Sequence, residues 1–139
     1  MGEKRLARKL VRAVDTNVIA RALMRDDAHQ ARIADAVLAT EAFVPLTVLL
    51  ETGWLLRARY GLSRSEVVTA LRSLLDMPKV LVDCREQVEW ALARLLERGD
   101  FADLIHLVAA RGATAFLTFD EDVAADAGDK APCPIETLA

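Results

Sequence analysis

Four carboxylates lie in segments that are otherwise apolar: Asp15, Glu51, Asp103 and Asp120. Burying a carboxylate without a partner costs at least several kcal/mol, and the usual compensation is an ion pair, hydrogen bonds or a metal ion. No lysine or arginine is spaced regularly against these four acids. A shared divalent cation would therefore account for all of them together.

The expected ligands are all oxygen atoms, which favours Mg²⁺ or Mn²⁺ over Zn²⁺. Without the cation, the carboxylates would repel one another, and the pKa of at least one of them would rise. A cation in an acidic pocket suits phosphodiester hydrolysis, because it polarises a phosphoryl oxygen and lowers the pKa of a bound water. The four acids thus predict a metal-dependent hydrolase site.

Other interpretations of single acids stay open. Asp15 is equally well placed to be the N-cap of the helix that follows it. Asp83 follows the apolar run KVLV much as Asp15 follows its strand, but its polar neighbours favour a helix cap. Asp122 replaces Asp120 as the fourth acid if the preceding strand ends later. His106 lies one turn after Asp103, where we expect a packed helix residue with one hydrogen bond.

Short apolar strands alternate with amphipathic helices along the chain. The patterns predict strands over 11–14, 42–44, 79–82 and 115–119, with an edge strand near 135–136. They predict helices from Thr16 or Asn17 through Leu23, and then over 26–40, 47–60, 63–75, 85–98 and 102–111, with an acidic turn or helix up to 127. This alternation is typical of an α/β fold with a parallel sheet covered by helices on both sides.

The positions of the acids fit such a sheet. Asp15 and Asp120 follow predicted parallel strands, and the carboxyl ends of parallel strands lie along one edge of the sheet, where open α/β folds bind ligands. Glu51 and Asp103 lie on helices whose ends are expected to reach that edge. The sequence therefore predicts one site built from four separate segments.

The chain of 139 residues has the length of one domain, and we expect a basic arm over 1–10 followed by a single domain over 11–139. Residues 1–12 hold five basic residues and one acidic residue, although the net charge of the chain is −3. We expect the arm to be a solvated tail rather than an RNA guide. Cys84 and Cys133 have no metal-binding spacing, so both are expected to be plain thiols.

The chain is apolar for its length, with 53% hydrophobic residues, so a buried partner surface such as a homodimer interface is expected. The apolar helices over 47–60 and 63–75 are the candidates for it. Trp54 and Trp90 fall in helical apolar patterns, which favours core or interface positions over base-stacking platforms. No membrane span or signal peptide is visible, so we expect a cytoplasmic protein.

Four motifs in register resemble PIN-domain ribonucleases, and specifically the VapC-type toxins of type II toxin–antitoxin pairs. These motifs are VDTNVI at 14–19, VLLETGWLL at 48–56, DFADLIHLVAARG at 100–112 and FLTFDEDV at 116–123. The resemblance covers almost the whole chain. It implies a three-layer α/β/α sandwich around a central parallel sheet.

The resemblance also implies roles for particular residues. Asp15, Glu51 and Asp103 match the acidic metal ligands, and Asp120 matches a fourth, more variable acid. Asn17 and Thr118 match supporting residues. Asn17 is expected to orient Asp15 by a hydrogen bond, and Thr118 is expected to share a strand face with Asp120.

The implied activity is a Mg²⁺- or Mn²⁺-dependent endoribonuclease that leaves a 5′-phosphate and a 3′-hydroxyl and is inhibited by a small antitoxin protein. Unpaired RNA is the expected substrate. The alternative is a PIN-like module that binds or regulates without cutting. A phosphatase with Asp15 as nucleophile would need a second Asp at the position that Asn17 occupies, and nucleotide binding would need a Gly-rich fingerprint that the sequence lacks.

Overall fold

A computed structural model describes residues 11–139, which fall into two compact units divided between Asp83 and Cys84. The expected basic arm over 1–10 lies outside the described residues. We call the described parts the N-terminal unit and the C-terminal unit. The single domain expected over 11–139 stays a prediction.

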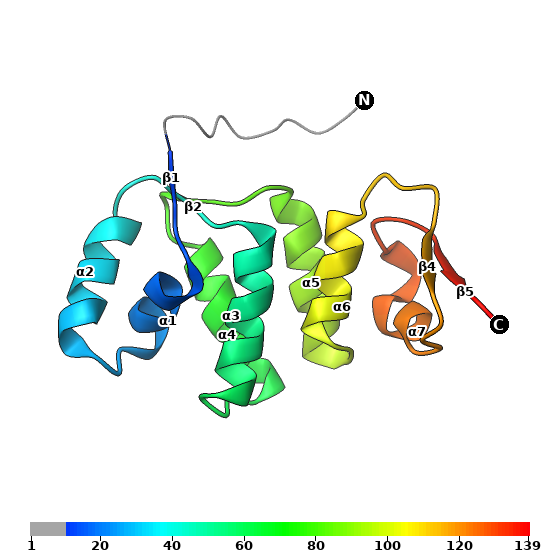
Figure 1. Cartoon of the computed structure of the whole chain (residues 1–139), viewed down its shortest axis with the longest axis horizontal. Helices are drawn as coiled ribbons and strands as arrows, with labels where there is room; N and C mark the ends of the chain where they lie inside the picture. The colour runs from blue at the N-terminus through cyan, green and yellow to red at the C-terminus, as the bar shows by residue number, and fades with distance from the viewer. Residues whose placement is uncertain (1–10) are drawn as a thin grey trace. The chain divides into compact units, whose positions relative to one another are not determined.

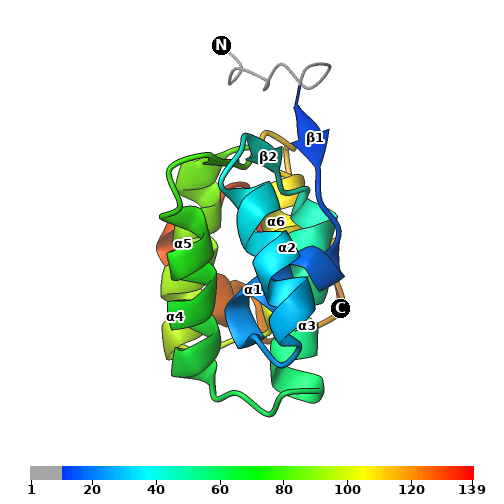
Figure 2. The same ribbon diagram turned by 90° about the vertical axis from the view of Figure 1, so that its left-hand side faces the viewer.

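The N-terminal unit contains three short parallel strands and four helices (Figure 1). Its elements are β1 (Arg12–Ala13), α1 (Thr16–Met24), α2 (Ala28–Leu38), β2 (Ala42–Phe43), α3 (Leu46–Ala58), α4 (Arg64–Leu75) and β3 (Val80–Leu81). The strand order is β1-β2-β3, and both pairings are parallel, with Arg12 opposite Ala42 and Phe43 opposite Leu81. Helix α1 packs against α2, α3 and α4 (Figure 2).

Polar side chains set where the helices of this unit begin. The Asp15 and Asp27 carboxylates cap α1 and α2, so the N-cap interpretation of Asp15 is confirmed. Ser63 and Glu66 form a capping box at the start of α4, in which the Glu66 N–H donates to Ser63 Oγ and the Ser63 N–H donates to Glu66 Oε1. Each cap gives a hydrogen-bond partner to backbone groups that the first helical turn leaves free.

The core of the N-terminal unit is built from helix faces. The apolar face of α4 is fully buried and consists of Val67, Val68, Leu71, Leu74 and Leu75. The fold itself covers these apolar residues of α4, and the partner surface expected over 47–60 and 63–75 stays a prediction. In α2, Ala34 and Leu38 are buried, whereas Ile33 is 53% exposed.

The C-terminal unit pairs two helices and adds a small parallel sheet. Its elements are α5 (Arg85–Glu97), α6 (Phe101–Ala109), β4 (Phe116–Thr118), α7 (Val123–Ala127), the 3₁₀ helix η2 (Gly128–Lys130) and β5 (Ile135–Thr137). Helices α5 and α6 pack side by side (Figure 1). Strands β4 and β5 pair in parallel, with Phe116 opposite Ile135, so the predicted edge strand is confirmed.

A small core lies under the β4–β5 sheet. It consists of the buried residues Leu107, Val123, Ala127 and Cys133, with Trp90 packed against them. The core position expected for Trp90 is thus confirmed, and its Nε1 is buried without a hydrogen-bond partner among residues 11–139. Cys84, rather than Asp83, is the N-cap residue of α5.

The strands are parallel, as predicted, but the pairings occur in two separate sheets, β1-β2-β3 and β4-β5. The described strands are also shorter than the predicted ones, because hydrogen-bonded pairing covers only two or three residues of each apolar run. No helix within residues 11–139 is long and apolar enough to cross a membrane.

Candidate active site

Asp15 lies between the end of β1 and the start of α1. Its backbone is extended, with φ −96° and ψ 178°, and its Oδ1 accepts a hydrogen bond of 3.3 Å from the Val18 N–H. The positive end of the helix dipole stabilises a carboxylate in this position. The helix therefore holds the Asp15 side chain in one orientation while Oδ2 has no hydrogen-bond partner within residues 11–139.

Glu51 of α3 contacts Thr16 of α1, where the two helices pack together. The hydroxyl of Thr16, which is only 8% exposed, donates a hydrogen bond to Glu51 Oε1. This bond joins the first residue of α1 to the second turn of α3. It fixes one oxygen of Glu51, and the described part of the chain gives Oε2 no partner.

These residues line one cavity of about 310 Å³ in the N-terminal unit. The cavity is lined by Asp15, Thr16, Asn17, Glu51, Trp54, Leu55 and Arg59. Two carboxylates, a hydroxyl, an amide and a guanidinium thus converge beside one exposed aromatic ring. The site includes Asn17, as the motif predicts, but no hydrogen bond between the Asn17 and Asp15 side chains is seen in residues 11–139.

Asp103 belongs to the C-terminal unit and lies in the first turn of α6. Asp100 is the N-cap of this helix, and its Oδ1 accepts a hydrogen bond of 2.7 Å from the Ala102 N–H. Partial burial raises the pKa of Asp103, and the negative charges of Asp100 and Asp120 raise it further. Repulsion among carboxylates, which the sequence predicts for a metal-free site, is therefore present in this unit.

Asp120 follows β4 and organises the turn into α7. Its N–H donates a 2.9 Å hydrogen bond to Thr118 Oγ1, and its Oδ1 accepts one of 2.9 Å from the Asp122 N–H. Thr118 therefore supports the backbone at Asp120 rather than its carboxylate. Asp122 is the N-cap residue of α7 and makes no side-chain capping bond.

The assumption that these carboxylates are buried is wrong for three of them. Asp15, Glu51 and Asp120 are exposed, and only Asp103 is partly buried. Apolar neighbours in the sequence do not imply burial at these positions, because each acid lies at the end of a strand or on the outward side of a helix. The packed position expected for His106 is also wrong, since its side chain is exposed and makes no hydrogen bond within residues 11–139.

The structure thus gives two acid pairs, Asp15 with Glu51 in one unit and Asp103 with Asp120 in the other. Within either unit, no three His, Cys, Asp or Glu side chains of the described residues form a metal-binding group. The donor set of each pair nevertheless fits a hard cation. All the donors are carboxylate oxygens, and Asp15 and Glu51 each keep one oxygen without a protein partner among residues 11–139.

Three residues of the site were missed or misassigned from the sequence. The sequence alone gives no site role to Thr16 or Arg59, and its apolar pattern predicts a core or interface position for Trp54. Trp54 is 60% exposed, so a core position is excluded. The helical spacing of Glu51, Trp54 and Leu55 was the available signal, because residues three and four apart share a helix face.

Comparison with known families agrees with this arrangement. The sequence model described as the PIN domain matches residues 12–129, and the chain therefore belongs to the PIN domain family. Neither the curated proteins nor the solved structures gave a significant match. Membership confirms the predicted α/β fold class, a three-layer α/β/α fold of the PIN type. It also identifies the chain as a member of a nuclease superfamily, whose proteins are hydrolases.

Proposed function

We propose that the protein is a metal-dependent endoribonuclease and the toxin of a toxin–antitoxin pair. The single observation that carries the proposal is the cavity at the start of α1, where Asp15 and Glu51 lie together and Thr16 fixes one Glu51 oxygen. The motif resemblance adds Asp103 and Asp120 to the proposed set of acids. After burial and the charge of Asp100, the charge of Asp120 is a further cause of the raised pKa of Asp103.

Asp15, Glu51, Asp103 and Asp120 would hold Mg²⁺ or Mn²⁺. When bound, the cation would polarise the phosphoryl oxygen, lower the pKa of the attacking water and stabilise the leaving oxygen. In the proposed reaction, water attacks phosphorus and the bond from phosphorus to the 3′ oxygen breaks. The products carry a 5′-phosphate and a 3′-hydroxyl.

The protein groups around the acids position them for this role. The N-terminus of α1 orients Asp15, and the Thr16 hydroxyl orients Glu51. Thr118 supports the turn that presents Asp120. Asn17 lines the same cavity as the first acid pair and is placed to donate its amide hydrogens to a substrate oxygen.

The test is cleavage of unstructured RNA by the purified protein in Mg²⁺ or Mn²⁺. We expect Asp15→Asn and Asp103→Asn each to lower the rate at least about a hundredfold, because each removes a negatively charged ligand. Asp129→Asn, an exposed acid of η2, is the matched control and should cleave normally. Cleavage at the normal rate by either site variant would refute the proposal.

The toxin role is tested separately. Expression of the protein without its antitoxin should stop bacterial growth, and Asp15→Asn should relieve the arrest at equal protein level. We also propose a homodimer, to be measured by light scattering at micromolar concentration. A monomer would refute the proposed dimer. It would not bear on the nuclease proposal, which the cleavage assay tests.

A further inference from the structure

Trp54 is a large aromatic side chain that the fold leaves in solvent. Its ring is 60% exposed, whereas Leu49 and Leu56 of the same helix are 1% and 0% exposed. Exposure of a single large apolar residue is common, but this one lines the cavity that holds Asp15 and Glu51. The ring therefore borders the proposed reaction centre.

A strip of α3 connects the acid pair to a basic side chain. Trp54 and Leu55 follow Glu51 by three and four residues, and Arg59 follows Leu55 by four, so these residues share one side of the helix. All of them line the same cavity. The strip presents a carboxylate, an aromatic ring and a guanidinium in order along the helix.

Arg59 differs from Arg21 of α1 and from Arg25, the C-cap of α1, in having no partner among the described residues. Arg21 binds Asp26 and Gln30, and Arg25 forms a two-hydrogen-bond ion pair with Asp35. Within residues 11–139, no hydrogen bond or ion pair is made by the Arg59 side chain. All five N–H donors of its guanidinium are therefore available to a ligand.

This combination matches one class of ligand. Aromatic side chains stack on unpaired bases of any sequence, and arginine binds phosphate through parallel hydrogen bonds. The cavity of about 310 Å³ is at the lower end of the roughly 300–1,000 Å³ range of small-molecule pockets, which suits one nucleotide rather than a duplex.

We propose that Trp54 and Arg59 form a nucleotide subsite for single-stranded RNA beside the Asp15–Glu51 pair. The base of one unpaired nucleotide stacks on the Trp54 ring, and an adjoining phosphate binds the Arg59 guanidinium. The inference rests on the proposed ribonuclease function. It adds positioning residues that hold substrate without taking part in the reaction.

The test measures RNA binding in the Asp103→Asn background, where proposed cleavage is blocked. The probe is a fluorescein-labelled, unstructured eight-nucleotide RNA of mixed sequence, followed by anisotropy in Mg²⁺. Trp54→Ala should weaken binding by about 5- to 150-fold, which corresponds to the roughly 1–3 kcal/mol of one base stack. Trp54→Phe, which keeps an aromatic face, should bind within a few-fold of the parent.

Arg59→Gln should weaken binding and also reduce its salt dependence. Loss of one phosphate contact should decrease the magnitude of the slope of log K against log salt by about 0.7 for a single strand. The matched controls are Arg57→Gln, an exposed arginine of the same helix that does not line the cavity, and Leu96→Ala, an exposed apolar residue of α5. Both controls should bind RNA as the parent does.

A second readout reports on Trp54 directly. In Trp90→Phe, Trp54 is the sole tryptophan of the chain, and RNA should quench its fluorescence. A blue shift that depends on protein concentration without RNA would instead show that another copy covers the ring, and would overturn the subsite.

The outcomes separate the two proposals. Unchanged RNA affinity in Trp54→Ala, or equal losses in Arg57→Gln and Arg59→Gln, would overturn the subsite and leave the ribonuclease proposal intact. Failure of the parent protein to bind the RNA, together with no cleavage by the wild type, would overturn the ribonuclease proposal and the subsite with it.

Discussion

Thr16 donates its hydroxyl hydrogen to Glu51, and this bond links the first residue of α1 to the acid in the second turn of α3. The two residues are 35 positions apart in the sequence. Thr16 is nearly buried, whereas Glu51 is exposed. The packed Thr16 side chain therefore sets the orientation of the Glu51 carboxylate. Hydrogen bonds of this kind, from a residue that does not itself bind the metal, typically orient metal ligands.

Removing that hydroxyl should weaken the site without unfolding the protein. Thr16→Val keeps the shape of the side chain but leaves Glu51 without its donor, so we expect Mn²⁺ affinity to fall about 10- to 100-fold. Thr16→Ser keeps the hydroxyl and should bind close to normally. Calorimetric titration of Mn²⁺ into both variants gives the comparison, and equal affinities would show that the bond has no role in the site.

The pKa of Asp103 should respond to its neighbour. Partial burial is the first cause of its rise and the charge of Asp100 the second, and Asp120 adds to the rise. Asp120→Asn removes one negative charge, so the pKa of Asp103 should move down toward the ordinary value. Carboxyl ¹³C NMR titration of the metal-free protein measures this shift, and an unchanged pKa would mean that the two carboxylates do not interact.

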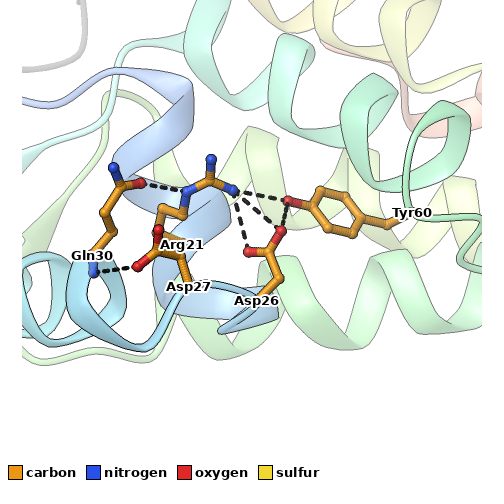
Figure 3. Close-up of polar contacts among 5 residues, drawn as sticks. All are labelled: Arg21, Asp26, Asp27, Gln30 and Tyr60. Carbon is orange, nitrogen blue, oxygen red and sulfur yellow. Dashed lines mark hydrogen bonds and ion pairs between the residues drawn. The ribbon is translucent and has the colours of Figure 1, made fainter.

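A polar network in the N-terminal unit predicts how stability changes with pH. Asp26 Oδ2 accepts a 2.9 Å hydrogen bond from the Tyr60 hydroxyl, and Arg21 Nη1 lies 3.2 Å from Asp26 Oδ1 (Figure 3). The Tyr60 hydrogen bond is the largest cause of the lowered pKa of Asp26, although partial desolvation opposes it. The network joins the end of α1 to the residue that follows the C-cap of α3.

Because the pKa of Asp26 is lower in the folded state, its contribution to stability is present above the ordinary value of 3.8 and is lost as pH falls through the folded value. Tyr60→Phe should therefore lower the free energy of unfolding at neutral pH, and the difference from wild type should shrink below about pH 4. Urea denaturation at pH 7 and pH 3 measures both values. A difference that is independent of pH would assign the effect to packing alone.

The sequence predicted most elements because each carries a local signal. The capping box at Ser63, the glycines that follow several helices and the alternation of strands with helices do not depend on distant contacts. The apolar runs did not reveal that the pairing occurs in two sheets or that each strand pairs over so few residues. Pairing depends on which backbones meet, and this is a property of the whole chain.

The site was predicted only at the level of residue types. Asp15, Glu51, Asp103 and Asp120 were identified by motif spacing, but their assumed burial was wrong, because exposure depends on which face of a helix meets its neighbours. Trp54 illustrates the same limit. Its sequence neighbours Leu55 and Leu56 are apolar, yet α3 turns Leu56 inward and leaves Trp54 in solvent.

The most direct test of the central claim is calorimetric titration of Mn²⁺ into the antitoxin-free protein and its Asp15→Asn and Asp103→Asn variants. The motif resemblance assigns both acids to the metal-binding set, and the account requires each of them for cation binding. It predicts that the wild type binds Mn²⁺ and that each variant loses binding. Undiminished binding in either variant, or no binding by the wild type, would contradict the proposed role of these acids as metal ligands.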